Sequence, residues 1–425
     1  MNVKLLATVF MFCAVVTGLS ASDDFFLSGP DHGAGLPSNK VYPAGRIFPY
    51  SGFSPQSVAD TRQRKFTLAG PAYAKGIRTL MQQSTEAKMP VIYTLNIIYK
   101  GNVLKKKGEL TVKDIDWNAI TDDITRQVKE ASSDKSIAWW YLTPEELRWW
   151  IPNEIKYLEL ACKAIKAADP DKRPVWTYSP CHRNGEDMAK EAAFLDIIGK
   201  GTYPNYAGQK NSRVWVRWSI EQEVNAIRLA AKKDAFPILV PEMFKEPAPE
   251  EKVLIPLWVR HDVYLGLVSG AKGVVVYSLS ARAKFPSHPV YYEAYSGIGA
   301  ELNGTSGLGQ VFLFGEPKND IQMKITGGPA TVVCKVKVKK EDTFTYPSLA
   351  FANLAYGNKR YLIAVNSAGY NLNVEFTGFP KDGITAVNTF AGKTVDPPTN
   401  GILKLEFKPY EVIGFVFSPT PKITK

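Results

Sequence analysis

Eight short apolar runs alternate with amphipathic segments between about residues 39 and 303, and this alternation constrains the fold most strongly. The intervening segments carry apolar residues at helical spacing, as at Leu158, Ala161, Cys162 and Ile165. Strands separated by helices pair in parallel, because parallel neighbours need a crossover connection. Eight such units predict an α/β fold, a (β/α)8 TIM barrel. A doubly wound open sheet is the competing architecture, but its usual glycine fingerprint is missing. The runs are 46–50, 66–73, 90–96, 137–142, 174–178, 195–203, 237–241 and 271–278.

The pattern changes after Asn303. Short runs at 332–338, 360–366, 372–376 and 402–407 are separated by Gly, Pro, Asn and Asp, which is typical of antiparallel strands joined by turns. We therefore expect a catalytic barrel at 23–305 and a C-terminal antiparallel β-sandwich domain at 306–425.

The first residues have the pattern of an export signal. Lys4 precedes the apolar run Leu5–Val16, and small residues follow before Asp23. This order predicts a cleavable signal peptide at 1–22 and a secreted or periplasmic protein. No later run reaches the roughly 18 apolar residues of a membrane span, so we expect no transmembrane segment.

Composition and motifs narrow the chemistry. Lys and Arg number 52 against 41 Asp and Glu, a formal charge of +11 that favours acidic partners such as nucleic acid, anionic lipid or an acidic polymer. The sequence has no HExxH motif, phosphate-binding glycine loop or GxSxG elbow, so we expect no metal, no cofactor and no acyl hydrolysis. The spacing of Cys162, Cys181 and Cys334 does not match a CxxC metal site. A disulfide between Cys162 and Cys181 is geometrically feasible, but we expect free thiols.

Two predicted strands end in carboxylates. The fourth run is followed by Thr143, Pro144, Glu145 and Glu146, and the seventh by Glu242. In a TIM barrel these positions meet at the C-terminal ends of the strands, where active sites lie. Cleavage of a glycosidic bond needs such a pair, one acid to protonate the leaving oxygen and one carboxylate to act at the sugar carbon.

Aromatic and polar residues at the same strand ends fit a carbohydrate pocket, since rings stack on sugar faces. For each ring the alternative is core packing; for His182 and Arg183 it is loop capping, with Asn184 starting a helix. Arg183 and Arg282 are also candidates for an anionic sugar. The predicted substrate-binding residues are Tyr50, Tyr141, Trp176, Tyr178, His182, Arg183, Tyr203, Tyr277 and Arg282.

The stretch Trp140–Glu145 (WYLTPE) and the tail segments Arg360–Asn366 and Phe407–Phe415 resemble a known clan. These are retaining glycoside hydrolases with a (β/α)8 barrel, including secreted bacterial glycosidase-like barrels with a C-terminal β-domain. The resemblance implies an acid/base after strand four and a nucleophile after strand seven. Pro144 stands where the best-known members have Asn.

Carried over, the resemblance makes Glu145 the acid/base, with Glu146 as the alternative, and Glu242 the nucleophile. We therefore expect a glycoside hydrolase acting on a poly- or oligosaccharide, with an acidic polysaccharide as the preferred substrate. The alternative is a barrel that binds carbohydrate without cleaving it. Nucleic acid is not an expected partner, since the Lys105–Lys107 run is its best support and fits a solvated turn.

Overall fold

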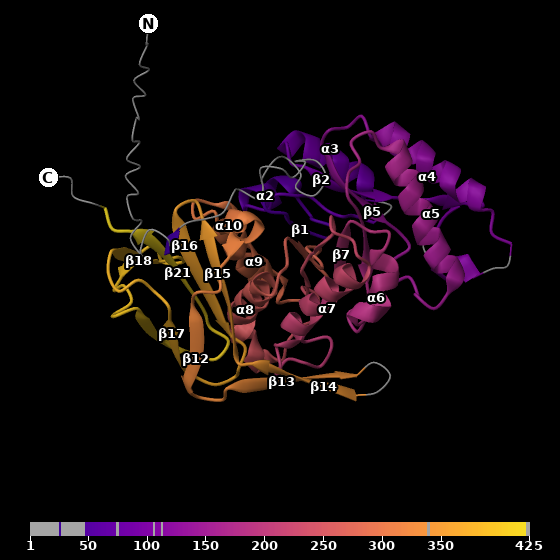
Figure 1. The fold of residues 1–425 in the computed structure, drawn as a ribbon. Coiled ribbons are helices and arrows are strands. Elements are labelled where there is room, and N and C mark those ends of the chain that lie inside the picture. Colours follow the sequence, from indigo (N-terminus) through magenta and orange to yellow (C-terminus); the bar gives the residue numbers. More distant parts are fainter. Residues whose placement is uncertain are drawn as a thin grey trace, which may run out of the picture.

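The computed structural model describes residues 25–26, 47–73, 76–104, 107–111, 114–337 and 341–421. The predicted signal peptide, 1–22, lies outside these residues. The chain forms a barrel of parallel strands covered by helices, flanked by antiparallel sheets near the C-terminus (Figure 1). Among the described residues, none of the helices combines the length and apolar character needed to cross a bilayer.

The predicted TIM-barrel fold is confirmed by the strand order. One parallel sheet has the order β2-β5-β6-β7-β8, and β9 pairs with the end of β7. β1 pairs in parallel with β10, so the first and last strands of the barrel are neighbours. Isolated bridges connect these sheets: Ala69 with Val91 and Leu239 with Val274 are parallel, and Gly52 with Gly70 is antiparallel. The strands are β1 (Tyr50–Gly52), β2 (Val91–Leu95), β5 (Ile137–Leu142), β6 (Val175–Ser179), β7 (Ile197–Thr202), β8 (Phe236–Pro237), β9 (Val240–Pro241) and β10 (Val274–Val276).

The second apolar run, 66–73, is not the strand that its composition predicts. It contributes only isolated bridges, at Ala69 and Gly70. Gly70 has a left-handed backbone, φ +86°, and Pro71 has no N–H to donate. Both features stop an extended ladder, so the chain turns here into the mouth of the barrel.

The helices form where the apolar spacing places them. Leu158, Ala161, Cys162 and Ile165 are all buried on one face of α5, as predicted. Asp116 caps α4 by accepting from the Ala119 amide at 3.0 Å. The helices are α2 (Val58–Gln63), α3 (Ile77–Ala87), α4 (Trp117–Ala131), α5 (Pro152–Ala168), α6 (Gly185–Ala192), α7 (Trp215–Leu229), α8 (Ile255–Val268), α9 (His288–Asn303) and α10 (Leu308–Phe314), with 3₁₀ turns at Lys107–Thr111 and Pro249–Leu254 and a small ribbon of β3 (Ile98–Tyr99) and β4 (Asn102–Val103).

Helix α10 was not expected from the sequence. It falls in the segment assigned to the β-sandwich, yet Leu308, Val311 and Phe312 are buried in the same apolar core as the barrel. Its seven residues contain five large apolar side chains, so periodicity alone could not separate a buried helix from a strand.

The C-terminal strands form the predicted β-sandwich. A six-stranded antiparallel sheet, β11-β15-β16-β21-β18-β19, faces a three-stranded sheet, β12-β17-β20, and β13 pairs with β14 as a separate hairpin. Leu362 and Phe417 from one sheet and Val374 and Phe376 from the other share a buried core. The strands are β11 (Glu316–Pro317), β12 (Gln322–Gly327), β13 (Thr331–Lys337), β14 (Glu341–Pro347), β15 (Leu349–Tyr356), β16 (Lys359–Asn366), β17 (Leu372–Thr377), β18 (Ile384–Asn388), β19 (Thr394–Val395), β20 (Ile402–Phe407) and β21 (Val412–Pro419).

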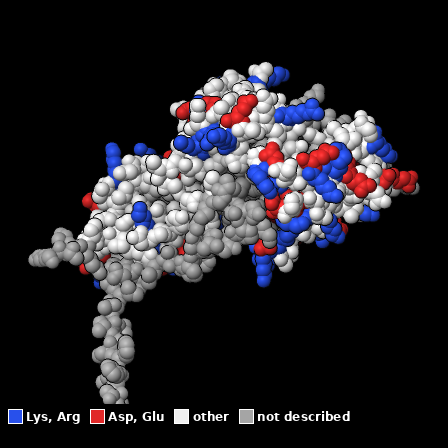
Figure 2. Space-filling model, turned by 90° about the horizontal axis from the view of Figure 1, so that it is seen from above, with Lys and Arg blue, Asp and Glu red and all other residues white. Residues whose placement is uncertain are grey.

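Charged side chains of both signs are interspersed on the face of the molecule shown in Figure 2. Exposed ion pairs of the described residues include Arg64 with Glu293 and Arg126 with Glu130. Surface pairs of this kind contribute little to stability.

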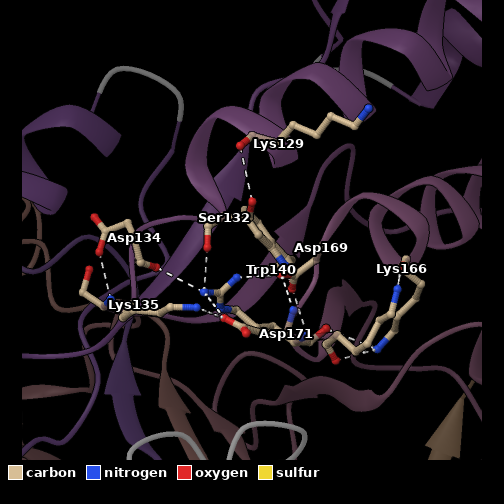
Figure 3. Close-up of polar contacts among 11 residues, drawn as sticks. Lys129, Ser132, Asp134, Lys135, Trp140, Lys166, Asp169 and Asp171 are labelled. Atoms are coloured by element: carbon tan, nitrogen blue, oxygen red, sulfur yellow. Dashed lines mark hydrogen bonds and ion pairs between the residues drawn. The ribbon is translucent and has the colours of Figure 1, made fainter.

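A buried polar network fixes the loop between α5 and β6 (Figure 3). The indole of Trp140 donates to Asp169 at 2.8 Å, and Arg173 donates to the same carboxylate at 2.7 Å. Arg173 also donates to the carbonyl of Ser132, at 3.0 Å. This network precedes β6, so it lies at the N-terminal end of the strands, where buried contacts stabilise the barrel.

Candidate active site

A cavity of about 940 Å³ opens at the C-terminal ends of the barrel strands. Its walls come from the loops after β1, after the 66–73 run, after β2 and after β5, together with the start of α3. The described residues that line it include Ser54, Gln56, Tyr73, Thr79, Gln83, Asn96, Thr143, Glu145 and Glu146. The cavity therefore combines amide, hydroxyl and carboxylate groups, which can bind a polyhydroxylated ligand.

Glu145 stands at the wall of this cavity with two tyrosine donors. The hydroxyl of Tyr141 donates to its carboxylate, and Tyr73 forms a second side-chain hydrogen bond with it. Burial raises the pKa of Glu145, while the two tyrosine bonds act in the opposite direction. A carboxyl group that keeps its proton above its ordinary pKa can serve as a general acid.

Glu146 lines the same cavity, from a strained turn. Its backbone is left-handed, φ +56°, which is uncommon for a residue with a side chain. Its amide donates to the carbonyl of Tyr178 at 3.0 Å, so the β5 turn is tied to β6. The negative charge of Glu146 also contributes to the raised pKa of Glu145.

Glu242 follows β9 but is held differently. Its two oxygens accept from the backbone amides of Asn205, at 2.6 Å, and Tyr206, at 3.0 Å. The residue is 3% exposed and is absent from the described lining of the cavity. Burial raises its pKa to about 7, although the amide bonds and the nearby Arg213 favour the ionised form.

A buried charged cluster supports the loop that binds Glu242. Arg213 donates to Asp262 at 2.9 Å and to the side-chain oxygen of Asn205 at 3.0 Å. Asp262 also contacts His261 at 2.9 Å. Backbone amides therefore hold the carboxylate of Glu242, and Arg213 holds the loop that carries them.

Tyrosines connect the two halves of the barrel mouth. Tyr277 directly follows β10, and its backbone forms an isolated parallel bridge with Glu242. Its side chain shares a hydrogen bond with Tyr73. Tyr73 in turn bonds Glu145, so a chain of rings runs from one carboxylate region to the other. Tyr73 is 42% exposed and is the ring in this chain that faces the cavity.

Most of the predicted substrate-binding rings are packed under this chain rather than along the cavity. Phe53 contacts Tyr141, Trp176 and Tyr277 with ring centroids 5.0 to 5.8 Å apart. Tyr141 and Trp176 have no exposed surface, and Tyr178 and Tyr203 are also buried. The rings fill the top of the barrel because small residues, such as Gly201 below Tyr203, leave room there.

The prediction for Tyr50 is corrected by its position. Its side chain is fully buried, and its hydroxyl donates to the carbonyl of Tyr295 at 2.7 Å. The run 46–50 continues to Gly52, so Tyr50 begins the strand instead of ending it. The ring consequently lies inside the barrel core.

The prediction for Arg183 is corrected in the same way. Arg183 is 3% exposed, pairs with Glu191 and donates to the carbonyl of Leu147. Its neighbour Asn184 caps α6 by accepting from the Asp187 amide at 2.8 Å, which is the capping alternative considered for this loop. A guanidinium occupied by a buried carboxylate is not available to a ligand.

His182 and Arg282 are exposed. Arg282 lies over Phe244 and Tyr277, 5.7 and 5.6 Å from the ring centres, and donates to Ser278 at 2.9 Å. It is thus a cation at the β10 side of the mouth.

The sequence analysis did not predict several residues that belong to the candidate site. Gln56, Gln83 and Asn96 line the cavity, and Asn205, Arg213 and Asp262 organise the environment of Glu242. Asn96 directly follows β2, so its strand-end position was a usable signal. The others lie on helices or long loops, where a single sequence does not show which side chains converge.

Among the described residues, no group of His, Cys, Asp and Glu is arranged to hold a metal ion. Cys162, Cys181 and Cys334 are free thiols, so the open Cys162–Cys181 pairing does not form.

No family model and no curated protein matches the sequence. The fold, however, is similar to solved glycosidase structures. An α-amylase from Geobacillus thermoleovorans complexed with acarbose has a TM-score of 0.50 at 11% identity, covering 88% of this chain and 99% of that one. A maltogenic α-amylase from Thermotoga neapolitana has 0.51 at 13%, covering 88% and 99%. A structure described as a glycoside hydrolase has 0.55 at 12%, covering 88% and 92%. The chain therefore has the barrel-plus-β-domain fold found in glycoside hydrolases.

Proposed function

We propose that the chain is a secreted glycoside hydrolase that cleaves O-glycosidic bonds of a poly- or oligosaccharide by a retaining, two-carboxylate mechanism. The observation that carries this proposal is Glu145, a partly buried carboxyl group after the fourth strand, which lines the cavity of about 940 Å³ and has a raised pKa. The glycosidase-type fold adds support, since the similar structures are described as amylases or glycoside hydrolases. Secretion rests on the sequence pattern of residues 1–22 alone.

In the proposed reaction, Glu145 donates its proton to the leaving oxygen as the glycosidic bond breaks. Glu242, ionised, attacks the anomeric carbon, and a water molecule later hydrolyses the glycosyl ester while Glu145 acts as base. The amides of Asn205 and Tyr206 favour the ionised form of Glu242, because they donate to the carboxylate. Attack requires the sugar to reach Glu242, which is 3% exposed.

The proposal of an acidic polysaccharide depends on fewer residues than the sequence suggested. Arg183 is engaged with Glu191, which leaves the exposed Arg282 as the cation that supports it. Arg282 lies beside Tyr277, so a carboxylate or sulfate on the substrate could pair with it while the sugar ring contacts tyrosine.

A carbohydrate-binding barrel without hydrolysis is the second candidate. It is favoured by one observation, the burial of Glu242 with each of its oxygens bound by a backbone amide. In that case Glu242 would be a structural anchor for the loop after β7, and the cavity would only bind sugar.

The test is a screen of purified protein against neutral, uronic-acid and sulfated glycans, with reducing-end release and binding measured side by side. Hydrolysis that is lost in both Glu145→Gln and Glu242→Gln, but kept in the exposed control Glu293→Gln, supports the proposed enzyme. The anomeric configuration of the first product, read by NMR, tests retention. Binding with no release from any glycan supports the second candidate.

A further inference from the structure

The hairpin of β13 and β14 leaves the sandwich and runs beside α7 of the barrel (Figure 1). A two-stranded hairpin has no core of its own and is marginally stable alone. Here Cys334 and Val336 are buried against the start of α7, where they pack with Trp215 and Trp218. Phe344 approaches Trp218 with ring centroids 6.2 Å apart. The hairpin is thus attached to the barrel through an apolar cluster.

The same hairpin also binds the loop between β7 and α7, residues 203–214, through its backbone. The side-chain amide of Gln209 donates to the carbonyl of Lys335 at 2.6 Å, and the hydroxyl of Ser212 donates to the carbonyl of Val333. These two bonds join the C-terminal part of the loop to one edge of β13.

The other end of this loop carries the two amides that bind Glu242. Asn205 and Tyr206 donate to the carboxylate at 2.6 and 3.0 Å. Arg213, one residue after Ser212, donates to the side chain of Asn205. One short loop therefore contacts the hairpin at Gln209 and Ser212 and the buried carboxylate at Asn205 and Tyr206.

We propose that the β13–β14 hairpin is a positioning element of the candidate active site: it holds loop 203–214 so that the Asn205 and Tyr206 amides stay bound to Glu242. Gln209 and Ser212 are the positioning residues, acting through the loop and not on the sugar. The effect on catalysis rests on the proposed function of Glu242, whereas the effect on the two amides does not.

The first test measures the amides directly, in the full chain. Removing both bonds in the double variant Gln209→Ala/Ser212→Ala should speed hydrogen–deuterium exchange at Asn205 and Tyr206 about tenfold or more, because two hydrogen bonds that restrain the loop are lost. Thr326→Ala is the matched control: Thr326 donates to the carbonyl of Asn373 at 3.2 Å, elsewhere in the C-terminal domain. Exchange at Asn205 and Tyr206 that equals that of the parent protein would overturn the proposal.

The second test measures catalysis on any glycan that the parent protein cleaves. Loosened amides favour the ionised form of Glu242 less, so the acidic limb of the rate profile should move to higher pH and kcat should fall while KM changes little. A double variant with altered exchange and an unaltered pH profile would remove Glu242 from the reaction and contradict the catalytic part of the inference. If the parent cleaves no glycan, the exchange result still decides whether the hairpin holds the loop, and the proposed enzymatic function is what fails.

Discussion

The burial of Glu242 predicts a pH-dependent cost of folding that Glu242→Gln should remove. In the folded chain the pKa of this carboxyl is about 7, raised by burial from its ordinary value of 4.5. The folded state therefore holds the proton more tightly than the unfolded state does. The stabilisation from protonated Glu242 is complete below pH 4.5 and is lost as the pH rises through 7, because the carboxyl must then ionise while buried.

The size of this effect follows from the same two values. One pKa step corresponds to about 1.4 kcal/mol, so the interval from 4.5 to about 7 amounts to about 3 kcal/mol. Glutamine does not titrate, and its single side-chain oxygen cannot accept from both amides. The stability lost through the missing hydrogen bond is therefore the same at every pH. The free energy of unfolding of the parent, minus that of Glu242→Gln, should consequently fall by about 3 kcal/mol between pH 4 and pH 8.

The assay is urea unfolding of parent and variant at intervals across that pH range, followed by tryptophan fluorescence. Glu293→Gln gives the baseline for losing one negative charge at the surface, since Glu293 is exposed. A difference between parent and Glu242→Gln that does not change with pH would refute the reasoning. It would show that the amides of Asn205 and Tyr206 compensate fully for burial of the charge.

Three further predictions concern the acid, its tyrosine partner and a buried ion pair. Glu145→Gln should lower kcat on unactivated glycans by about 10²–10⁴-fold, with a smaller loss on aryl glycosides whose leaving group needs no proton; equal losses on both would contradict an acid role. Tyr73→Phe removes a donor that lowers the pKa of Glu145, so the alkaline limb of the kcat/KM profile should move to higher pH; a shift to lower pH would contradict the assignment. Arg183→Met leaves Glu191 buried without its partner and should cost about 3–5 kcal/mol in urea unfolding while KM is unchanged; a raised KM at parental stability would restore Arg183 as a ligand contact.

The strand and helix pattern was largely available from the sequence, because apolar periodicity records which face of each element is buried. The run 137–142 is β5 and the 402–407 run is β20, with the same limits. The strand predicted at 66–73 was wrong because the Gly70–Pro71 pair, which is visible in the sequence and typical of a turn, outweighs the apolar composition; the structure adds the left-handed backbone at Gly70. Helix α10 was not predicted because a heptamer with five large apolar side chains and one polar one, Gln310, does not reveal its period.

Part of the candidate site could likewise be predicted from the sequence, and part could not. That Glu145 ends a strand, and so reaches the mouth of a barrel, follows from sequence order and the rule that strand ends meet there. The bond from Tyr73 to Glu145 and the amides of Asn205 and Tyr206 on Glu242 join residues distant in the chain. The pairing of Arg183 with Glu191 spans only eight residues, but it forms because the loop after β6 folds inward and buries both side chains. Sequence by itself placed Glu145 and Glu242 directly after apolar runs that are strands in the structure, since periodicity is local. Only the tertiary structure decided which of them face the cavity and in what electrostatic environment, because burial and hydrogen bonding are properties of groups brought together by folding.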